Sequence, residues 1–239
     1  MVGAAGRMGS EACRAIEADP DLALVARVGR GDSLEDLVDA RVEVAVDFTS
    51  PEVVRDNVRF YLGKGIHAVV GTSGLTAADL EEIGRWAGAS RANAFVAPNF
   101  AIGAVLMMRL AAQAAPHFQR GEIVERHHDR KRDAPSSTAL RTADLMNRAR
   151  AEPWAAADPG TESIAGSRGG DAAGVRIHSL RLPGSVAHQE VVLGGPGETL
   201  TIRHDSVDRA SFMPGVLLAI RRVSSSDDLT VGLERLLGL

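Results

Sequence analysis

The sequence predicts an α/β protein in which a parallel sheet wrapped by helices is followed by a smaller α+β domain with a mixed sheet. In the first 100 residues, apolar β-branched runs alternate with segments of helical period, as is typical of a parallel sheet covered by helices. After residue 100, three strand candidates follow one another with glycine turns between them, which favours antiparallel or mixed pairing. The 239 residues, 45% of them apolar, are enough for a sizeable core.

The first part owes its elements to two patterns. Continuous apolar runs, typical of strands buried on both faces, occur at Ala23–Val28, Val42–Phe48, His67–Val70 and Asn93–Ala97. Apolar residues recur at helical spacing in Ser10–Glu17, Pro51–Gly63 and Ala77–Ala87. We assign residues 1–100, together with 210–239, to one domain.

The second part, residues 101–209, mixes helices and strands. Helices are predicted at Ala101–Phe118 and Ser136–Arg150, and a further helix, at Phe212–Arg222, returns to the first domain. Strands are predicted at Gly121–His127, Val175–Leu182, His188–Leu193 and Glu198–His204. Gly160–Ala173 is rich in glycine, serine and charge, and we expect an exposed loop there.

The composition argues against several classes of function. The net charge of −4 gives no general electrostatic reason to bind nucleic acid or an anionic membrane. No apolar run approaches the roughly 18–20 residues that span a bilayer, and no secretory signal opens the chain. The single cysteine, Cys13, fits a reducing compartment and is expected to be a small core residue. We expect a cytoplasmic protein without nucleic-acid or membrane partners.

Three glycines open the chain at Gly3, Gly6 and Gly9. Such a loop lets backbone N–H groups approach a pyrophosphate at a helix N-terminus, although an ordinary tight turn has the same composition. Only Met1 and Val2 precede it, and two residues cannot make a buried central strand. The sequence therefore predicts a Rossmann-like dinucleotide-binding domain without its first strand. We expect this chain to bind cofactor more weakly and to melt at a lower temperature than a version extended upstream by about 5–6 residues.

The end of the second predicted strand bears on the cofactor. Arg27 and Arg30 lie there, and no acidic residue occurs before Asp32. Acidic residues at this position hold a ribose 2′-hydroxyl, whereas arginine suits a 2′-phosphate, so the charges favour NADPH over NADH. The alternative is a pair of solvated surface arginines.

The densest chemical cluster follows the strand predicted at 121–127. His127, His128 and Lys131 lie just before Pro135 and a Ser-Ser-Thr run that is typical of a helix start. A helix start suits a carboxylate, and a histidine and a lysine beside it can supply protons. Only Lys64 and Lys131 among the 27 basic residues are lysines, and lysine, unlike arginine, can give up a proton.

Three other interpretations of this segment compete. His127, His128 and Asp129, with His117, could bind a metal ion, but neighbours on an extended strand point to opposite faces, so we expect no metal. A nucleic-acid patch is disfavoured because the arginines alternate with acids and lack aromatic neighbours. A solvated polar connection is the third.

At this segment the chain resembles the dihydrodipicolinate reductases. Residues 125–139, Glu-Arg-His-His-Asp-Arg-Lys-Arg-Asp-Ala-Pro-Ser-Ser-Thr-Ala, follow the family motif with one clear departure. Further similar motifs occur in order along the chain, at Gly3–Gly9, Asp47–Pro51, Gly71–Gly74, Ala97–Phe100, Arg181–Gly184, His188, Gly197–Glu198 and Arg203–His204. The details of Ala101–Leu106 are most similar to the actinobacterial branch.

The resemblance implies reduction of the cyclic imine formed from 4-hydroxytetrahydrodipicolinate, giving tetrahydrodipicolinate for diaminopimelate and lysine biosynthesis, with NADPH or NADH. It implies that His127 is the proton donor and acceptor and Lys131 a proton donor, with a homotetramer joined through the C-terminal sheets and a hinge between the domains. Substrate contacts would come from His128, Ser136, Ser137 and Thr138. Cofactor contacts would come from Gly3, Ala4, Ala5, Gly6, Arg7 and Met8, from Gly71, Thr72 and Ser73, and from Ala97, Pro98, Asn99 and Phe100.

Three departures from the family pattern leave rivals open. Ser137 stands where the family has glycine, Ser73 replaces threonine, and Gly29 takes the acidic ribose-contacting position, with Arg27 and Arg30 on either side. Glycine could be needed at 137 for a positive φ or for space beside the substrate. The rivals are a homologue without activity that binds nucleotide and assembles, and another two-domain reductase such as an amino-acid dehydrogenase.

Overall fold

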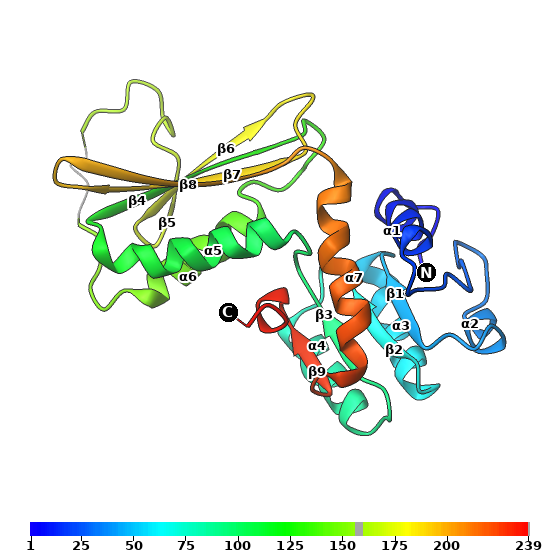
Figure 1. Ribbon diagram of the computed structural model, residues 1–239. Coiled ribbons are helices and arrows are strands. Elements are labelled where there is room, and N and C mark those ends of the chain that lie inside the picture. The colour runs from blue at the N-terminus through cyan, green and yellow to red at the C-terminus, as the bar shows by residue number, and fades with distance from the viewer. Residues whose placement is uncertain (156–159, 239) are drawn as a thin grey trace. The chain divides into compact units, whose positions relative to one another are not determined.

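The computed structural model describes residues 1–155 and 160–238, which form two compact units (Figure 1). The first unit comprises Met1–Ile102 and Arg209–Leu239, and the second comprises Gly103–Asp208. In the described part of the chain, no helix combines the length and the apolar character needed to cross a membrane.

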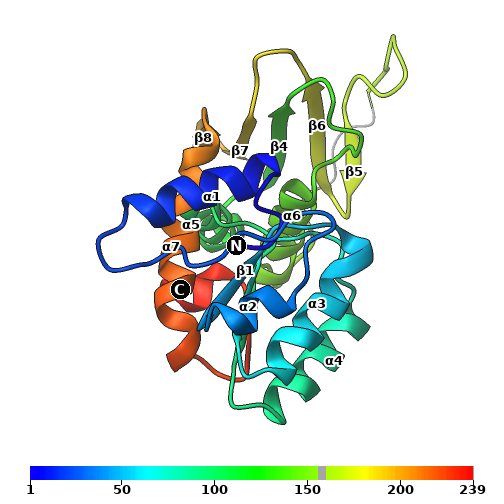
Figure 2. The ribbon, with the colours of Figure 1, turned by 90° about the vertical axis from the view of Figure 1, so that its right-hand side faces the viewer.

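The first unit is built on a parallel sheet of four strands in the order β1, β2, β3, β9. These strands are β1 (Val44–Asp47), β2 (His67–Val70), β3 (Ala94–Val96) and β9 (Leu229–Val231). The helices of this unit are α1 (Arg7–Ala18), α2 (Glu35–Asp39), α3 (Pro51–Gly63), α4 (Ala77–Gly88) and α7 (Met213–Arg222), and α5, described below, begins at its last residue. Helix α3 packs beside α4, and α1 packs against α7 (Figure 2). The parallel order and the covering helices confirm the predicted α/β class.

Val2 occupies the place beside β1 that a first strand would take. It makes isolated parallel bridges to Val28 on one side and to Asp47 on the other, and Met1 and Val2 are both buried. The prediction of a strand over Ala23–Val28 was wrong, because only Val28 finds a neighbour in this short ladder. A pocket of about 390 Å³ lies alongside, lined among others by Met1, by residues 21–26 and by residues 41–44. The expected weakening of cofactor binding and of stability by this short ladder stays a prediction.

Other predicted elements of this unit agree closely with the structure. Pro51–Gly63 and His67–Val70 have the predicted bounds, while Val42–Phe48 is shortened to Val44–Asp47. Helix α4 begins with a capping box, in which the Thr76 hydroxyl accepts from Asp79 N and the Asp79 carboxylate accepts from Thr76 N. Helix α2 and strand β9 were not predicted, because each has five residues or fewer and shows no period of its own.

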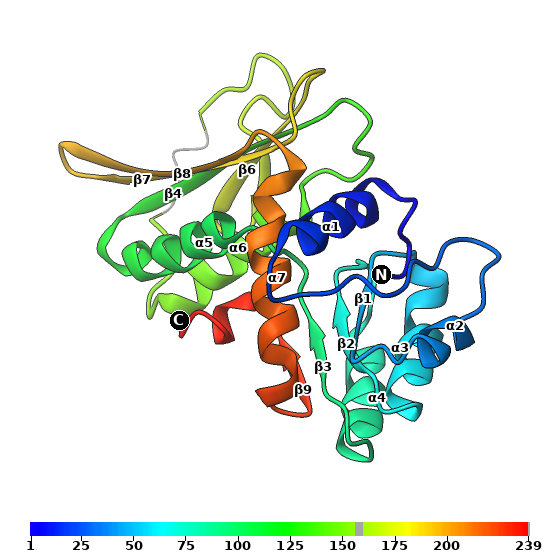
Figure 3. The same cartoon turned by 45° about the vertical axis from the view of Figure 1, so that its right-hand side comes forward.

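The second unit is built on a mixed sheet of five strands in the order β5, β6, β4, β7, β8, as predicted for this part of the chain. The strands are β4 (Arg120–His127), β5 (Gly170–Ala172), β6 (Val175–Arg181), β7 (Ala187–Gly195) and β8 (Glu198–Ser206), with β4 parallel to β6 and the other pairs antiparallel. Helices α5 (Ile102–Ala114) and α6 (Ser137–Ala149) lie along one face (Figure 3). The core between them and the sheet includes Ala111, Met146 and Ile123.

Two predictions for this unit need correction. The helix predicted over Ala101–Phe118 ends at Ala114 and continues as one 3₁₀ turn, Ala115–His117, because Pro116 has no N–H to continue the α-helical ladder. The loop predicted over Gly160–Ala173 contains strand β5, which pairs with β6 through backbone bonds that composition does not reveal.

The carboxylate of Asp47, fully buried at the end of β1, connects three segments of the first unit. Its Oδ1 accepts hydrogen bonds from Thr49 N at 3.0 Å, Thr49 Oγ1 at 2.6 Å and Thr72 Oγ1 at 3.1 Å. Its Oδ2 accepts from Asn57 Nδ2 at 2.9 Å and from Tyr61 Oη at 2.8 Å. Burial, and then the charge of Asp47, raise the pKa of the Tyr61 hydroxyl, which stays a donor. Asp47 thereby holds the turns after β1 and β2 against α3.

Tyr61→Phe removes one donor to Asp47 without changing the ring. Because the carboxylate is buried, we expect the free energy of unfolding to fall by about 1–3 kcal/mol. Chemical denaturation of the single variants Tyr61→Phe and Asp47→Asn and of the double variant measures the coupling between them. Additive losses would contradict the contact.

Candidate active site

A pocket of about 810 Å³ lies at the carboxyl edge of the parallel sheet in the first unit. Its lining comes from the loop after Val2, from residues 28–34 and from the turn after β1, including Gly3, Gly6, Phe48 and Thr49. This edge is where open parallel sheets bind ligands, because the loops after neighbouring strands converge there.

The glycine loop has no room for side chains at two of its positions. Gly3 has φ +79°, and a Cβ there would lie 2.4 Å from the carbonyl oxygen of Phe48. A Cβ on Gly9 would lie 2.0 Å from the carbonyl oxygen of Gly3, so the loop and α1 touch backbone to backbone. Helix α1 has Gly6 as its N-cap, with no side-chain cap and no acidic residue in its first turn. A pyrophosphate fits this uncapped helix start.

The structure places the residues predicted for the cofactor in three groups. Gly3, Ala5, Gly6 and Arg30 line the pocket, and Ala4, Arg7 and Met8 belong to the same loop and the first turn of α1. Gly71, Thr72 and Ser73 follow β2, and Ala97, Pro98, Asn99 and Phe100 follow β3. Within these two groups Thr72, Ala97 and Phe100 are buried, whereas Ser73 and Pro98 are exposed.

Two residues near the pocket make contacts other than those that their sequence positions suggest. Arg27 is not part of the lining, and its guanidinium pairs with Glu17 on α1. Asp32, which had no assigned role, lines the pocket, and its Oδ2 accepts a hydrogen bond from Gly29 N at 2.8 Å. The sequence has Gly29 where related sites have an acid. The next acid, Asp32, lies three residues later, and its carboxylate binds the backbone N–H of Gly29.

In the second unit, the two-residue period of β4 places Glu125 and His127 on the same face as Ile123, toward α6. His127 pairs with Arg181 in the neighbouring parallel strand β6, so the two side chains leave the sheet together. Glu125 is fully buried at this point, a position that apolar residues usually fill.

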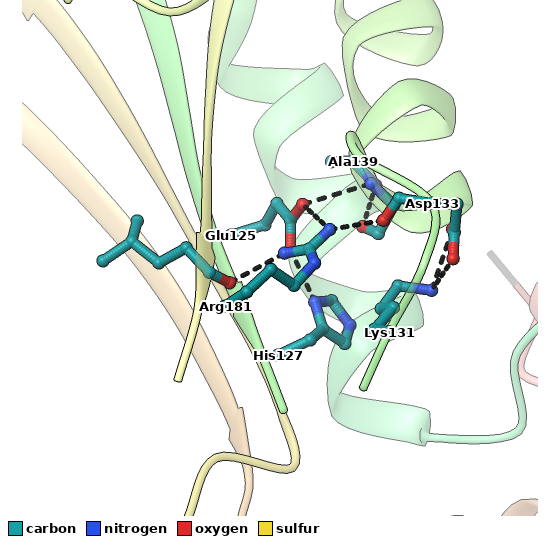
Figure 4. Close-up of polar contacts among 8 residues, drawn as sticks. Glu125, His127, Lys131, Asp133, Ala139 and Arg181 are labelled. Carbon is teal, nitrogen blue, oxygen red and sulfur yellow. Dashed lines mark hydrogen bonds and ion pairs between the residues drawn. The ribbon is translucent and has the colours of Figure 1, made fainter. Parts of the chain in front are cut away.

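Four hydrogen bonds satisfy the Glu125 carboxylate (Figure 4). Its Oε2 lies 2.5 Å from Nδ1 of His127 and 2.9 Å from Nη1 of Arg181. Its Oε1 accepts from Nη2 of Arg181 at 2.8 Å and from Ser136 N at 3.2 Å. Burial raises the pKa of Glu125, but the hydrogen bonds from His127 and Arg181 outweigh it and lower this pKa to about 2. An ionised carboxylate only accepts, so Nδ1 of His127 carries a proton and Nε2 is left for other contacts.

Lys131 lies on the loop between β4 and α6 and is held by an acid two residues on. Its Nζ is 2.9 Å from both carboxylate oxygens of Asp133. The hydrogen bond from Lys131 lowers the pKa of Asp133. The Lys131 side chain is 22% exposed, so a ligand can reach it.

Helix α6 begins where the Ser-Ser-Thr run predicts. The Ser136 hydroxyl caps the helix by accepting from Ala139 N at 3.2 Å, and Ser136 is buried. Ser137 is the first helical residue and is exposed, and its φ is not positive, so its backbone does not require glycine. Farther along, Thr142 accepts from Gln189 of β7 at 2.7 Å, which fixes the helix to the sheet.

The structure therefore connects His127, the loop that carries Lys131 and the start of α6 through Glu125 and Arg181, and His128 directly follows β4. Glu125 and Arg181 had no assigned role in the sequence. The signal that could have found them is the charge of Glu125 at an inward position two residues before His127, since a buried acid requires buried hydrogen-bond donors, which a cation can supply.

Comparisons with known proteins identify the family of this chain. The family models for the N-terminus and the C-terminus of dihydrodipicolinate reductase match residues 1–100 and 103–237. A relative from Nocardia farcinica and one from Streptomyces griseus, both named 4-hydroxy-tetrahydrodipicolinate reductase, are each 52% identical over this whole chain, which spans 98% and 97% of their lengths.

A solved structure agrees as well. The dipicolinate-bound dihydrodipicolinate reductase from Paenisporosarcina sp. TG-14 has a TM-score of 0.88 and 37% identity, with 98% of this chain and 97% of that chain covered. A probable dehydrogenase from Thermotoga maritima, 14% identical with a TM-score of 0.60, shares the fold. The chain belongs to the dihydrodipicolinate reductase family.

Proposed function

We propose that this chain is a 4-hydroxy-tetrahydrodipicolinate reductase, which reduces the cyclic dicarboxylate imine to tetrahydrodipicolinate in diaminopimelate and lysine biosynthesis. The observation that carries the proposal is the grouping of a histidine, a lysine and a capped helix start around the Glu125 carboxylate. The full-length identity to enzymes of this name supports it. A nicotinamide cofactor supplies the hydride when bound in the pocket of the first unit.

The substrate carries two carboxylates, and the second unit offers two kinds of partner for them. The start of α6 presents N–H groups and hydroxyls at Ser137 and Thr138, where the helix dipole favours an anion. Ser136 stabilises this helix start, since its hydroxyl caps the helix. Lys131 offers a cation, and His128 is the remaining proposed contact.

Protons are managed by His127 and Lys131 in this proposal. Because Glu125 holds Nδ1 of His127, the free nitrogen Nε2 faces the substrate and exchanges the proton. Lys131 delivers a proton to the ring nitrogen as a ring carbon accepts hydride, and Asp133 holds its ammonium in place. The nitrogen loses this proton when a neighbouring ring carbon gains one through His127, so that the product keeps its C=N bond.

We propose NADPH as the preferred cofactor. Arg30 lines the pocket and Gly29 stands at the position where related sites carry an acid, so a 2′-phosphate finds a cation there. Asp32 already accepts from Gly29 N, which turns one of its oxygens away from a ribose. Arg27 would contribute only after leaving Glu17.

The roles of the two units and the assembly belong to the same proposal. The first unit would bind the dinucleotide, and the second would bind substrate and join four copies through its sheet in the cytoplasm. The mostly exposed strand β8, in which Leu200 is 38% exposed, supports an interface there.

One of the two rival functions, a homologue without activity, loses one of its grounds, because the helical backbone at Ser137 needs no glycine.

Lys131→Ala tests the chemistry, and Lys64→Ala is its matched control because Lys64 is the chain's other lysine and pairs with Glu35 in the first unit. With freshly generated hydroxytetrahydrodipicolinate and NADPH, we expect kcat to fall by about 100-fold or more in Lys131→Ala, since a positioned proton donor contributes that much. Lys64→Ala should keep the wild-type rate. An unchanged rate in Lys131→Ala would remove this residue from the mechanism.

Arg30→Ala tests the cofactor preference. Removal of a cation from a 2′-phosphate should raise KM for NADPH by about 10-fold, the equivalent of one charge-assisted hydrogen bond, and leave KM for NADH nearly unchanged. Arg14→Ala, which removes an exposed arginine paired with Glu11 on α1, is the control. Equal changes for both cofactors would argue against a phosphate contact.

A further inference from the structure

The contacts of Glu125 and Arg181 extend to every part of the site in the second unit. Glu125 reaches Nδ1 of His127 with one oxygen and Ser136 N with the other. Arg181 binds both of these oxygens at 2.8–2.9 Å, and its Nη2 also donates to the carbonyl oxygen of Asp133 at 2.6 Å. The loop that carries Lys131 is therefore fixed at Asp133 by Arg181 and at Ser136 by Glu125 (Figure 4).

We propose that Glu125 and Arg181 are positioning residues for the reduction, which hold His127 in a single tautomer and fix the Lys131 loop and the start of α6 against it. The inference rests on the proposed function for the reaction it serves, while the tautomer and the loop anchoring are properties of the chain alone.

Geometry argues for a role beyond stability. A buried ion pair seldom stabilises a fold more than apolar residues of the same volume would, so its presence needs another reason. Here the pair joins strands β4 and β6 to the helix start through hydrogen bonds that an apolar pair could not make. The planar guanidinium can bind two carboxylate oxygens and a carbonyl at once, which the single ammonium of lysine cannot reproduce.

The same two strands carry a matched pair on their other face. Glu122 of β4 lies 2.8 Å from Nε2 of His178 of β6, the same residue types in a similar contact. Both side chains are partly exposed, at 46% and 28%, and neither touches the Lys131 loop or α6 in the contacts described. Glu122→Gln is therefore a control for loss of a Glu–His contact between these strands.

The first test compares Glu125→Gln with Glu122→Gln in steady-state reduction of the imine by NADPH. An amide cannot accept from His127 and Arg181 as a carboxylate does, so we expect kcat to fall by about 10- to 100-fold while KM for NADPH, set in the first unit, stays within about twofold. Arg181→Lys keeps the charge but not the fork and should retain more activity than Arg181→Met. Glu122→Gln should match the wild type. Wild-type kcat in a folded Glu125→Gln variant would overturn the proposal.

The second test needs no substrate and no turnover. Imidazole ¹⁵N shifts of His127 at pH 8, assigned by the signal lost in His127→Gln, should show the Nδ1-protonated tautomer in the wild type and a shift toward the Nε2-protonated form in Glu125→Gln. If that variant does not fold, the tautomer of the wild-type protein decides the point alone. If the wild-type protein lacks reductase activity but shows this tautomer, the proposed function fails and the positioning geometry stands. An Nε2-protonated His127 in the wild type would refute the positioning role.

Acid unfolding checks that the Glu125 carboxylate is ionised and engaged. Because its hydrogen bonds lower its pKa from 4.5 to about 2, the stability it contributes is complete above pH 4.5 and is lost as the pH falls through about 2. The unfolding free energy of the wild type should therefore fall more steeply across this range than that of Glu125→Gln. Parallel curves would contradict the engaged carboxylate.

Discussion

The Glu125 carboxylate has no solvent-accessible surface, so the protein itself must satisfy the hydrogen-bonding capacity of both oxygens. That constraint dictates what surrounds it. Arg181 of the adjacent strand β6 supplies a cation that binds both oxygens. One oxygen remains for His127 and the other for the backbone at Ser136. The position of His127 and that of the start of α6 are therefore fixed by the same buried group.

The first unit follows the same principle with a different set of donors. Asp47 is also fully buried at the end of a strand, but its partners are hydroxyls, an amide and a backbone N–H instead of an arginine. It holds the turn that lines the pocket of the first unit, as Glu125 and Arg181 hold the loop that carries Lys131. In each unit a buried acid fixes the geometry of a loop that follows a strand. Such loops are otherwise the more mobile segments of a protein.

Much of this could be predicted from the sequence because the signals are local. The apolar runs and helical periods identified most of the strands and helices, and the Ser-Ser-Thr run marked the start of α6 correctly. The strand predicted over Ala23–Val28 was wrong because a strand needs a neighbour to pair with, and local composition does not reveal the pairing partner. The contacts of Glu125 with Arg181, 56 positions apart, were missed for the same reason: only the parallel pairing of β4 with β6 brings them together.

The roles proposed for the residues of both units depend on the identity of the reaction. The decisive measurement follows NADPH oxidation by the wild-type protein with freshly generated hydroxytetrahydrodipicolinate and quantifies the product by mass spectrometry. We predict one tetrahydrodipicolinate formed for each NADPH oxidised, with deuterium appearing in the product ring when the cofactor is deuterated at the transferred position. Absence of turnover, or oxidation of NADPH without this product, would contradict the assignment.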